Sequence, residues 1–374
     1  MPLALAVVAV WLYLLLGRGG FWRMREPGAE SLRPERWPRI VAIVPARNEE
    51  GLVGRAVASL AAQRYAGEFH IVLVDDDSTD ATAQAALDAA PPTLLTVVRA
   101  APLPAGWTGK LWAVAEGIRH AALLNPGYLL LTDADIVHPP GNLALLATRA
   151  AAGYDMVSAM ATLHCRTLAE RALVPAFVFF FFLLYPPAWI RDSRRATAGA
   201  AGGCILIRRA ALEGIGGIAS IAGELIDDCA LARAVKRRGG RLWLGLSRDT
   251  RSIRTYSTFA EIGRMISRTA FTQLGHSVGM LAVTALGMLT VFLVPPVMAL
   301  AARGGTAAAG ACAWALMSII YLPALRYYRL SPLWAPLLPL VAAFYTGATV
   351  HSAVAYWRGT GGQWKGRVQD VVKL

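Results

Sequence analysis

The stretch FHIVLVDDDSTD, residues 69–80, runs from apolar side chains into a cluster of acidic ones. Its first half is short, apolar and rich in branched side chains, which is typical of a strand covered on both faces of a sheet. A helix that begins after the strand would explain Ser78 as its N-cap and Asp80 as a first-turn acid. The start of a helix does not account for the acidic residues Asp75 and Asp76. We therefore interpret this strand end as part of a ligand site, where a carboxylate accepts hydrogen bonds from the base or ribose of a nucleotide.

Similar apolar runs recur along the chain, and their order predicts the fold class. Further strands are expected at 40–44, 94–98, 128–131 and 155–161, and helices at 48–64 and 78–90. Strands that alternate with helices predict an α/β fold, a mostly parallel sheet with helices on both faces. Ligands bind such sheets beyond the carboxyl ends of the strands. Neither GxGxxG nor GxxxxGK[ST] follows the first strand, which counts against a dinucleotide-binding oxidoreductase and a P-loop nucleotide hydrolase.

The composition indicates a membrane protein. Of the 374 residues, 56% are hydrophobic and 16% are charged, whereas a soluble domain carries roughly 25% charged residues. The net charge of +13 fits an anionic membrane surface, and no nucleic-acid-binding module accompanies it. The four cysteines form no CxxC pair, so neither a disulfide framework nor a structural zinc site is expected.

Two apolar segments lie in the first half of the chain. Residues 1–17 are expected to form an N-terminal transmembrane anchor. Arginines follow it from Arg18 onward, and the positive-inside rule keeps them in the cytoplasm. Residues 173–190, with four consecutive phenylalanines, lie inside the stretch 38–272 that we interpret as one cytoplasmic domain. They are typical of an interfacial membrane segment, and a buried core helix is the alternative.

Three longer apolar runs follow, and each approaches the ~20 residues that a helix needs to cross a bilayer. They cover 276–302, 306–325 and 333–356, and they predict a membrane domain of about three transmembrane helices over 276–356. Simple alternation places the basic tail, 357–374, outside, whereas the positive-inside rule keeps it in the cytoplasm. A re-entrant third run would resolve the conflict, so the side of the tail stays open.

More acidic residues follow the fourth strand and open a later helix. Asp133 and Asp135 come after 128–131 and, two positions apart on an extended segment, they point the same way. Two carboxylates on one side suit a hard divalent cation that neutralises a diphosphate. Asp227 and Asp228 open a helical stretch. Acids there are either ordinary partners of the helix dipole or, facing a cleft, a general base with a raised pKa.

Two basic positions complete the candidate set. Lys110 ends the stretch GWTGK and can reach a phosphate as a point charge, although by itself it is more typical of a solvated surface lysine. Arg268 follows Arg264 by four positions, just before the membrane runs. That spacing suits an amphipathic interfacial helix, and it equally suits an arginine held over a diphosphate leaving group.

The order of these motifs resembles that of inverting family 2 glycosyltransferases of the GT-A type. The shared features are strand ends DDDSTD and DAD, the GK pair, an acidic pair before a helix, and a basic helix entering the membrane. The resemblance covers about residues 39–269 and the membrane arrangement. More narrowly, the anchor, PARNEE, GWTGK and WKGR (364–367) make the chain similar to hopanoid-associated glycosyltransferases and, more distantly, to ceramide glucosyltransferases.

This resemblance implies a role for each matching residue. It assigns the nucleotide-sugar donor to Pro45, Arg47, Glu49, Asp76, Lys110 and Asp133. Asp76 would contact the base and Asp133 the ribose, and Lys110 would lie near the diphosphate. Asp135 would bind Mg²⁺ or Mn²⁺.

It also implies the catalytic set. Asp228 would be the catalytic base, Asp227 stands where many members have glutamate, and Arg268 would face the leaving group. Processive and ceramide-type members carry (Q/R)xxRW here, whereas MISRT (265–269) keeps only the arginine. That departure favours a single transfer over polymer synthesis.

The sequence therefore predicts a multi-pass enzyme of the cell inner membrane with its catalytic domain in the cytoplasm. The predicted reaction transfers a sugar from a nucleotide-diphosphate donor to a membrane lipid, with a hopanoid suggested by the resemblance alone. An inactive scaffold or lipid-handling protein with a transferase-like domain is the alternative. A nucleotidyltransferase is disfavoured, because PARNEE (45–50) is not the glycine-rich basic loop such enzymes use.

Overall fold

The structure, a computed structural model, describes residues 1–24, 34–362 and 365. It contains two compact units, and each is described by itself. A sheet-containing unit comprises Arg25–His164 and Trp189–Arg254, and a helical unit comprises Met1–Met24, Cys165–Ala188 and Thr255–Leu374. Trp364 and Arg367 of the WKGR stretch, and most of the basic tail, lie outside the described residues.

The first of these units is built on one eight-stranded sheet, in the order β3-β2-β1-β4-β7-β6-β8-β5. The strands are β1 Ile40–Ala46, β2 Phe69–Asp75, β3 Leu95–Arg99, β4 Tyr128–Thr132, β5 Ile136–Val137, β6 Met156–Thr162, β7 Cys204–Arg208 and β8 Leu242–Ser252. β1 pairs in parallel with β2 and β4, β2 with β3, and β6 with β8. β7 is antiparallel to β4 and β6, and β5 to β8. The predicted mostly parallel sheet is confirmed.

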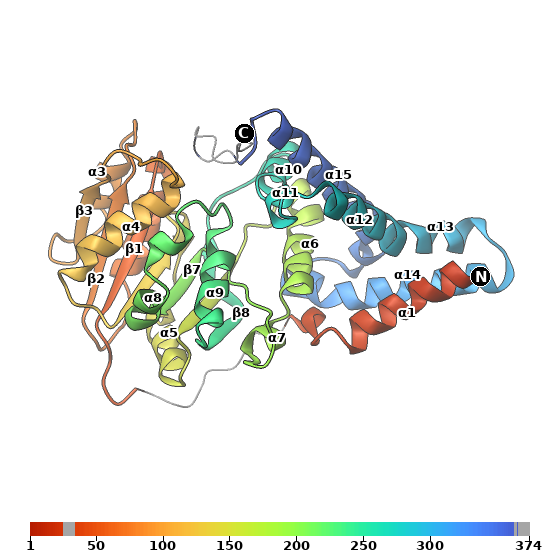
Figure 1. Ribbon diagram of the computed structural model, residues 1–374, viewed down its shortest axis with the longest axis horizontal. Helices are drawn as coiled ribbons and strands as arrows, with labels where there is room; N and C mark the ends of the chain where they lie inside the picture. The colour runs from red at the N-terminus through yellow and green to blue at the C-terminus, as the bar shows by residue number, and fades with distance from the viewer. Residues whose placement is uncertain (25–33, 363–364, 366–374) are drawn as a thin grey trace. The chain divides into compact units, whose positions relative to one another are not determined.

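Helices cover both faces of this sheet (Figure 1). They are α2 Glu50–Ala61, α3 Thr82–Leu87, α4 Gly109–Ala122, α5 Asn142–Ala151, α8 Arg209–Gly214 and α9 Asp227–Arg237, with a short turn, η2 Ile218–Ile221. α7, Pro187–Arg191, begins in the helical unit and ends in this one.

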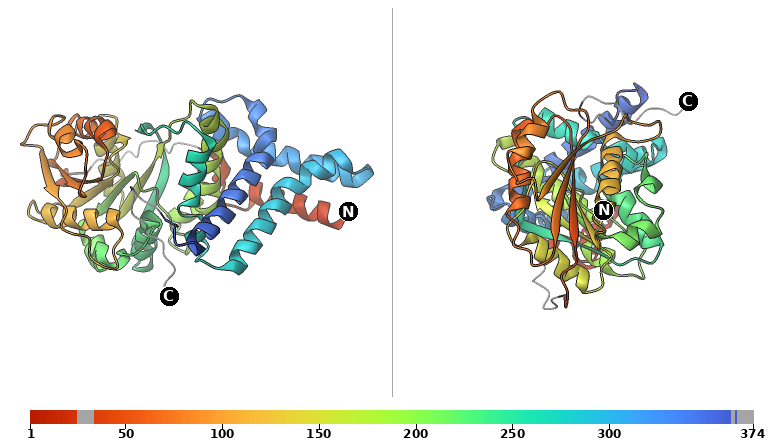
Figure 2. Two further views of the ribbon diagram at one scale, coloured as in Figure 1. Left: turned by 90° about the horizontal axis from the view of Figure 1, so that it is seen from above. Right: turned by 90° about the vertical axis from the view of Figure 1, so that its left-hand side faces the viewer.

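The residues of β1 alternate between two helical layers (Figure 2). Ile40, Ala42 and Val44 share one buried cluster with residues of α2, α3 and α5. Ile43 faces α4, since a Cβ added at Gly117 of α4 would lie 2.5 Å from the Ile43 Cγ2 atom. α4 therefore approaches the strand more closely than a residue with a Cβ allows.

The parallel pairing brings the predicted ligand-binding segments to one edge of the sheet. β1 and β2 stay in register up to Ala46 and Asp75, and β4 runs parallel to β1 on its other side. The segments after these strands carry Arg47, Asp76 and Asp133, and they leave the sheet at the same edge.

The other unit consists of helices. They are α1 Pro2–Leu16, η1 Phe21–Arg23, α6 Leu168–Leu184, α10 Phe259–Ser267, α11 Ala270–Gln273, α12 Val278–Met288, η3 Leu289–Leu293, α13 Val294–Ala301, α14 Gly304–Tyr327, η4 Pro332–Leu337 and α15 Leu338–Trp357. Among the described residues, four stretches are long and apolar enough to cross a membrane: Leu168–Arg191, Val278–Ala301, Gly304–Tyr327 and Pro332–Trp357. The last three coincide with the apolar runs found in the sequence.

The segment 173–190 forms most of α6 and part of α7. Phe179 is fully buried, and its ring contacts those of Phe21 and Tyr321. This packing fits the buried-helix alternative, and the length and composition also fit a membrane span. α6, like residues 255–272, packs with the helical unit, although the sequence analysis placed both within 38–272.

The break in the first C-terminal run has an identifiable cause. Pro295 lacks the N–H that would donate to the Val291 carbonyl four positions earlier. The chain forms a π-helical turn, η3, at this point, and the Trp11 indole Nε1 donates to the Val291 carbonyl at 3.0 Å. A side chain of α1 therefore satisfies a backbone group that the proline leaves without its helical donor.

Candidate active site

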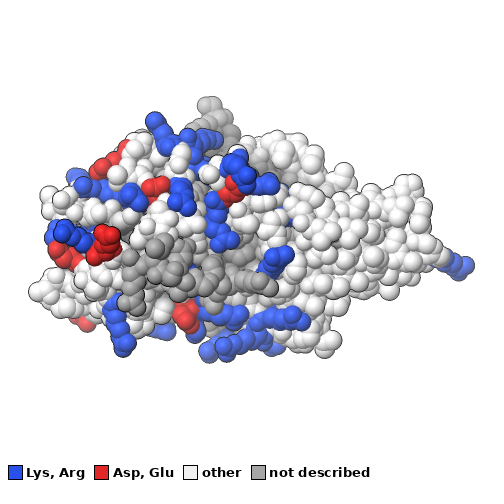
Figure 3. All heavy atoms as spheres, turned by 90° about the horizontal axis from the view of Figure 1, so that it is seen from below, with Lys and Arg blue, Asp and Glu red and all other residues white. Residues whose placement is uncertain are grey.

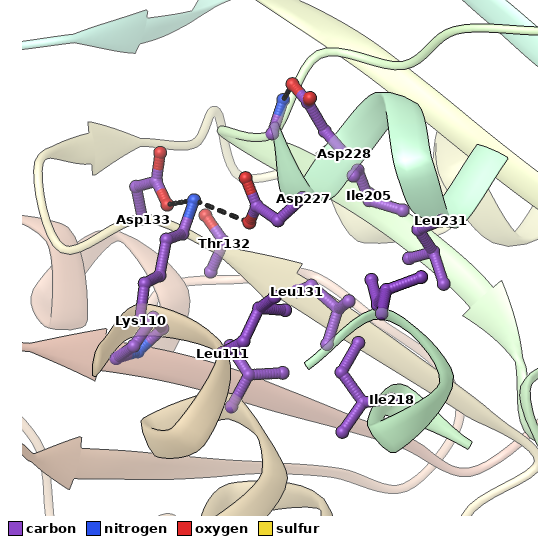
Figure 4. Close-up of a pocket in the computed structure, with 14 residues that line it drawn as sticks. Lys110, Leu111, Leu131, Thr132, Asp133, Ile205, Ile218, Asp227, Asp228 and Leu231 are labelled. Atoms are coloured by element: carbon purple, nitrogen blue, oxygen red, sulfur yellow. Dashed lines mark hydrogen bonds and ion pairs between the residues drawn. The ribbon is translucent and has the colours of Figure 1, made fainter. Parts of the chain in front are cut away.

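Lys110 stands at the centre of a charged cluster at the carboxyl edge of the sheet (Figure 4). Its Nζ lies 2.9 Å from Asp133 Oδ1 and 3.1 Å from Asp227 Oδ2. Lys110 belongs to the first turn of α4, Asp133 follows β4, and Asp227 is the first residue of α9. Burial by itself lowers the pKa of Lys110, but the charges of Asp133 and Asp227 outweigh burial and raise that pKa. The lysine is therefore positively charged.

Asp228 lies beside this cluster with both carboxylate oxygens bound to backbone amides. Oδ2 accepts from the Gly202 N–H at 2.8 Å and Oδ1 from the Cys229 N–H at 2.6 Å. Burial and the charge of Asp227 raise the pKa of Asp228 to about 6, against the opposing effect of Lys110 and the two amides. Its carboxylate is thus a stronger base than an ordinary aspartate, and it is still ionised at neutral pH.

A pocket that opens to solvent adjoins these charges. Its polar lining includes Lys110, Asp133, Asp227 and Asp228, and Pro45 lies at its wall. The rest of its lining is mainly apolar and comes from Leu111, Val114, Leu131, Ile205, Ile218, Ile221 and Leu231 (Figure 4). An apolar surrounding disfavours ionisation, which explains why burial is the largest cause of the raised pKa of Asp228.

A second charged group forms around Arg254, just after β8. Its Nη2 lies 2.6 Å from Glu49 Oε1, and its Nε lies 3.2 Å from Asp135 Oδ2. Ser252 Oγ donates to the same Asp135 oxygen at 2.9 Å. Burial and the nearby charge of Asp133 raise the pKa of Asp135, and Arg254 opposes this effect.

Arg254 and Ser252 were not among the site residues predicted from the sequence. The only sequence signal is their place near the carboxyl end of a strand. That strand was not predicted, because the second half of β8, SRDTRS, is polar and its residues do not alternate.

The oxygen donors near this edge fit a divalent cation that arrives with its ligand. Within the described residues, no three His, Cys, Asp or Glu side chains form a cage that could hold a metal. Mg²⁺ is usually bound by one or two carboxylates together with substrate phosphates, so such a cage is not required. Asp133 and Asp135 supply hard oxygen atoms, and each already contacts a cationic side chain, Lys110 and Arg254 respectively. The site therefore attracts positive charge at both carboxylates.

Arg47 ties the loops after β1 and β2 together. Its Nη1 donates to the carbonyl of Asp76 at 2.5 Å and to that of Asp77 at 3.0 Å. Asn48 Oδ1 accepts from the Thr79 N–H at 2.8 Å. Asp76 is 2% exposed, so this predicted base-contacting residue lies within the loop structure that Arg47 holds.

The predicted site residues thus fall into distinct groups. The structure brings together Lys110, Asp133, Asp227 and Asp228, with Pro45 at the same pocket. Glu49 and Asp135 share Arg254, and Arg47 and Asp76 form the loop contact described above. Arg268 is the C-cap of α10 in the helical unit, and its role stays a prediction.

Comparisons with known proteins identify the class of the chain and its fold. The model of the family described as glycosyl transferase family 2 matches residues 41–216, which include β1, β2, β4 and the carboxylates after them. These residues form a family 2 glycosyltransferase domain. The chain is accordingly an enzyme of the glycosyltransferase class. No curated protein sequence matches it.

A solved structure shows the same fold for the transferase. The mannosyltransferase PcManGT from Pyrobaculum calidifontis, in complex with GDP-Man and Mn²⁺, is 20% identical with a TM-score of 0.61, covering 94% of this chain and 98% of its own. Glucosyl-3-phosphoglycerate synthase from Mycobacterium tuberculosis, with Mn²⁺, UDP-glucose and phosphoglyceric acid, is 17% identical with a TM-score of 0.41. That match covers 64% of this chain and 79% of the synthase. The likeness to the mannosyltransferase shows the GT-A fold, and the narrower relation to hopanoid or ceramide enzymes stays a prediction.

The titration of Asp228 predicts how the transferase responds to pH. If this carboxylate accepts a proton during turnover, only its ionised form is active. Because its pKa is raised to about 6, turnover is expected to fall as the pH decreases through about 6. Below that value the loss should approach about tenfold per pH unit. Initial rates between pH 4.5 and 8 measure this, and a rate that stays constant down to pH 5 would contradict the role.

Gly202 is expected to be intolerant of a side chain. A Cβ there would lie 3.3 Å from Asp228 Oδ2 and 3.5 Å from Lys110 Nζ, so alanine requires the carboxylate to shift. Gly202→Ala should reduce kcat by roughly tenfold or more, since small displacements of a reacting group are costly. Gly141→Ala is the matched control, because nothing lies within 4 Å of its added Cβ. Equal kcat values for the two variants would show that the position of Asp228 is not critical.

Proposed function

We propose that this enzyme transfers one sugar from a nucleotide-diphosphate donor to a hydroxyl of a membrane lipid, with inversion at the anomeric carbon. The observation that carries the proposal is Asp228, a carboxylate of raised pKa at an apolar pocket beside the Lys110 cluster. A base of this kind suits proton removal from an acceptor hydroxyl. The GT-A fold and the family 2 domain supply the class of donor.

The helical unit supports a lipid as the acceptor. Leu286, Leu300 and Leu340 lie on the candidate spans and are 67%, 78% and 67% exposed. Figure 3 shows almost no Lys, Arg, Asp or Glu on the visible face of this unit, whereas charged residues are scattered over the sheet-containing unit. Large exposed apolar surfaces of this kind are covered by lipid in membrane proteins. We infer a multi-pass protein of the inner membrane, with the domain 38–272 on the cytoplasmic side and the anchor 1–17.

The donor is proposed to lie along the carboxyl edge of the sheet. Asp76 would contact the base within the loops held by Arg47, while Pro45 and Glu49 complete that first loop. Asp133 would accept from the ribose, and Lys110 would attract the diphosphate. Lys110 is already charged and paired with Asp133 and Asp227. Its ammonium group would therefore be shared between these carboxylates and the diphosphate once the donor binds.

Asp135 is proposed to hold the divalent cation, Mg²⁺ or Mn²⁺, together with donor phosphate oxygens. Its carboxylate is a hard oxygen ligand, and Ser252 and Arg254 fix its Oδ2 atom. The cation would supply positive charge that stabilises the departing nucleoside diphosphate. Arg268 is proposed to add charge for the same leaving group.

The proposed step is a single displacement at the anomeric carbon. The acceptor hydroxyl gives its proton to Asp228, and its oxygen forms a bond to the anomeric carbon. The bond between that carbon and the diphosphate oxygen breaks on the opposite face, so the configuration inverts. The nucleoside diphosphate leaves with the electron pair, and Asp228 releases the proton to solvent before the next cycle.

The experiment that tests this function labels the lipids directly. Membranes that contain the full chain are incubated with Mn²⁺ and a panel of radiolabelled nucleotide sugars that includes GDP-mannose and UDP-glucose, and the lipids are then extracted. Label in a lipid with the parent chain but not with Asp135→Ala supports the proposal and names the donor. Mass spectrometry of the labelled lipid then shows whether the acceptor is a hopanoid. Absence of both lipid label and metal-dependent nucleotide binding would contradict the proposal.

A further inference from the structure

A chain of buried hydrogen bonds lies behind the strand end that carries Asp133. Thr132, the last residue of β4, is 2% exposed, and His138 and Asn142 are each 3% exposed. His138 Nε2 lies 2.9 Å from Thr132 Oγ1, and His138 Nδ1 lies 3.0 Å from Asn142 Nδ2. Thr132 Oγ1 in turn donates to the carbonyl of Gly203 at 2.8 Å.

The direction of these bonds follows from the groups involved. The amide nitrogen of Asn142 can only donate, so His138 Nδ1 accepts and His138 Nε2 carries the hydrogen. Asn142 Oδ1 accepts from Thr250 Oγ1 at 3.3 Å, which fixes the orientation of the amide. Burial lowers the pKa of His138 to about 4, so the ring is neutral and holds one tautomer. Donation therefore runs from Asn142 through His138 and Thr132 to Gly203.

Gly203 follows the residue whose amide binds Asp228. The Gly202 N–H donates to Asp228 Oδ2 at 2.8 Å. On the preceding side, the Ala201 N–H donates to Ser158 Oγ at 2.8 Å. Ser158 thus holds the segment 201–203 at Ala201, and Thr132 holds it at Gly203. The Gly202 N–H, between these two residues, donates to Asp228.

Burial of these polar side chains carries a desolvation cost, which their hydrogen bonds offset. Polar side chains lose their hydration when they are buried, and apolar residues of similar shape are often at least as stabilising. Among these side chains, only Thr132 lines the pocket, where it lies beside Asp133 and Lys110 (Figure 4). Asn142 Nδ2 also lies 3.7 Å from Cys204 Sγ. The described hydrogen bonds of these side chains therefore end on Gly203, on the adjacent Cys204 and on Thr250 of β8.

We propose that His138 and Thr132 are positioning residues that hold the Gly202 amide against Asp228, and so set the orientation and proton affinity of the catalytic base. This inference rests on the proposed role of Asp228. If the segment 201–203 moves, the Gly202 N–H no longer favours the ionised carboxylate. Asp228 is then displaced from the acceptor hydroxyl, and its proton is bound more tightly.

Two variants of His138 test the direction of donation along this series of hydrogen bonds. In His138→Gln the side-chain NH₂ can replace the Nε2–H group that donates to Thr132. In His138→Asn the shorter side chain can replace only Nδ1, which accepts from Asn142, so the bond to Thr132 is lost. His138→Asn is expected to lower kcat by roughly 10- to 100-fold, because Thr132 and Gly203 lose their anchor. His138→Gln should recover most of that loss.

Threonine variants test the next link. Thr132→Val keeps the side-chain shape but removes the hydroxyl, and it should lower kcat as His138→Asn does, whereas Thr132→Ser should recover it. Thr148→Val is the matched control, since the described hydrogen bond of this buried hydroxyl is its donation to the Ala144 carbonyl within α5. Thr148→Val should leave kcat unchanged, and thermal unfolding of all variants reveals any general loss of stability.

The decisive readout is the acid limb of the pH profile. Turnover is measured as the release of nucleoside diphosphate by the full-length protein in membranes. The donor is GDP-mannose or UDP-glucose, whichever of the two labels lipid in the experiment above. Thr132→Val and His138→Asn should move the acid limb to higher pH while the KM for the donor stays near that of the parent. An unmoved limb and unchanged kcat in both variants would overturn the positioning role, provided that Asp228→Asn lowers turnover at least ~100-fold. If Asp228→Asn turns over at the rate of the parent, the proposed function itself fails, whatever the His138 variants do.

Discussion

Asp228→Asn is expected to reduce turnover by roughly 10²–10⁴-fold, the usual cost of losing a general base. The reason lies in the contacts of the carboxylate as well as in its charge. Oδ1 and Oδ2 each accept from a backbone N–H, so an asparagine must turn its NH₂ toward one of these donors. The variant loses the proton acceptor and also one hydrogen bond, and Lys110 loses a nearby negative charge.

The affinity for the donor distinguishes a catalytic base at Asp228 from a residue that only binds the donor. Affinity for the labelled nucleotide sugar, measured with Mn²⁺ and without acceptor, should stay close to that of the parent chain. Asp249→Asn provides the matched control, because Asp249 is an exposed residue whose only described ion pair is with Arg251 in the same strand. If Asp228→Asn lowered donor affinity as much as turnover, Asp228 would be a binding residue and not the base.

Asp135→Asn is expected to abolish the metal dependence of donor binding. The two described donors to this side chain, Ser252 Oγ and Arg254 Nε, both reach the same oxygen, Oδ2. The single oxygen of an asparagine can accept both bonds, so the local structure should persist while the charge and one metal ligand are lost. Loss of an outer-shell partner already costs roughly 10–100-fold in metal affinity, and loss of a direct ligand should cost more than about 100-fold.

Mn²⁺ binding measured by electron paramagnetic resonance provides a readout that does not depend on activity. Titration of the full chain with Mn²⁺ in the presence of a nucleoside diphosphate should show a bound ion for the parent and for Asp249→Asn, but not for Asp135→Asn. Thermal unfolding of the three proteins in the absence of metal should be similar. Parental Mn²⁺ affinity in Asp135→Asn would place the cation elsewhere.

Much of the fold was predictable because its signals are local. β1 and β2 are continuous apolar runs, and a strand buried on both faces requires such runs. β8 and β5 were missed, because one is half polar and the other has two residues. A strand of either kind is stabilised by its neighbours in the sheet and not by its own pattern.

The candidate site was predictable in part, for the same reason. DDDSTD and DAD stand out because several acids follow apolar strands, and this pattern is visible without any neighbour. Lys110 shows the limit of that approach. Its sequence context fits a surface lysine, and only the structure reveals that Asp133 and Asp227 hold its ammonium group at 2.9 and 3.1 Å.

The sequence by itself determined the α/β class, the apolar segments and the carboxylates at the strand ends, since each depends on residues close together in the chain. Only the tertiary structure decided which of these carboxylates meets which cation. Arg254 and Glu49 are 205 positions apart, yet Nη2 and Oε1 lie within 2.6 Å. Pairing across such a separation depends on the order of strands in the sheet, which places the ends of β1 and β8 by packing rather than by local pattern.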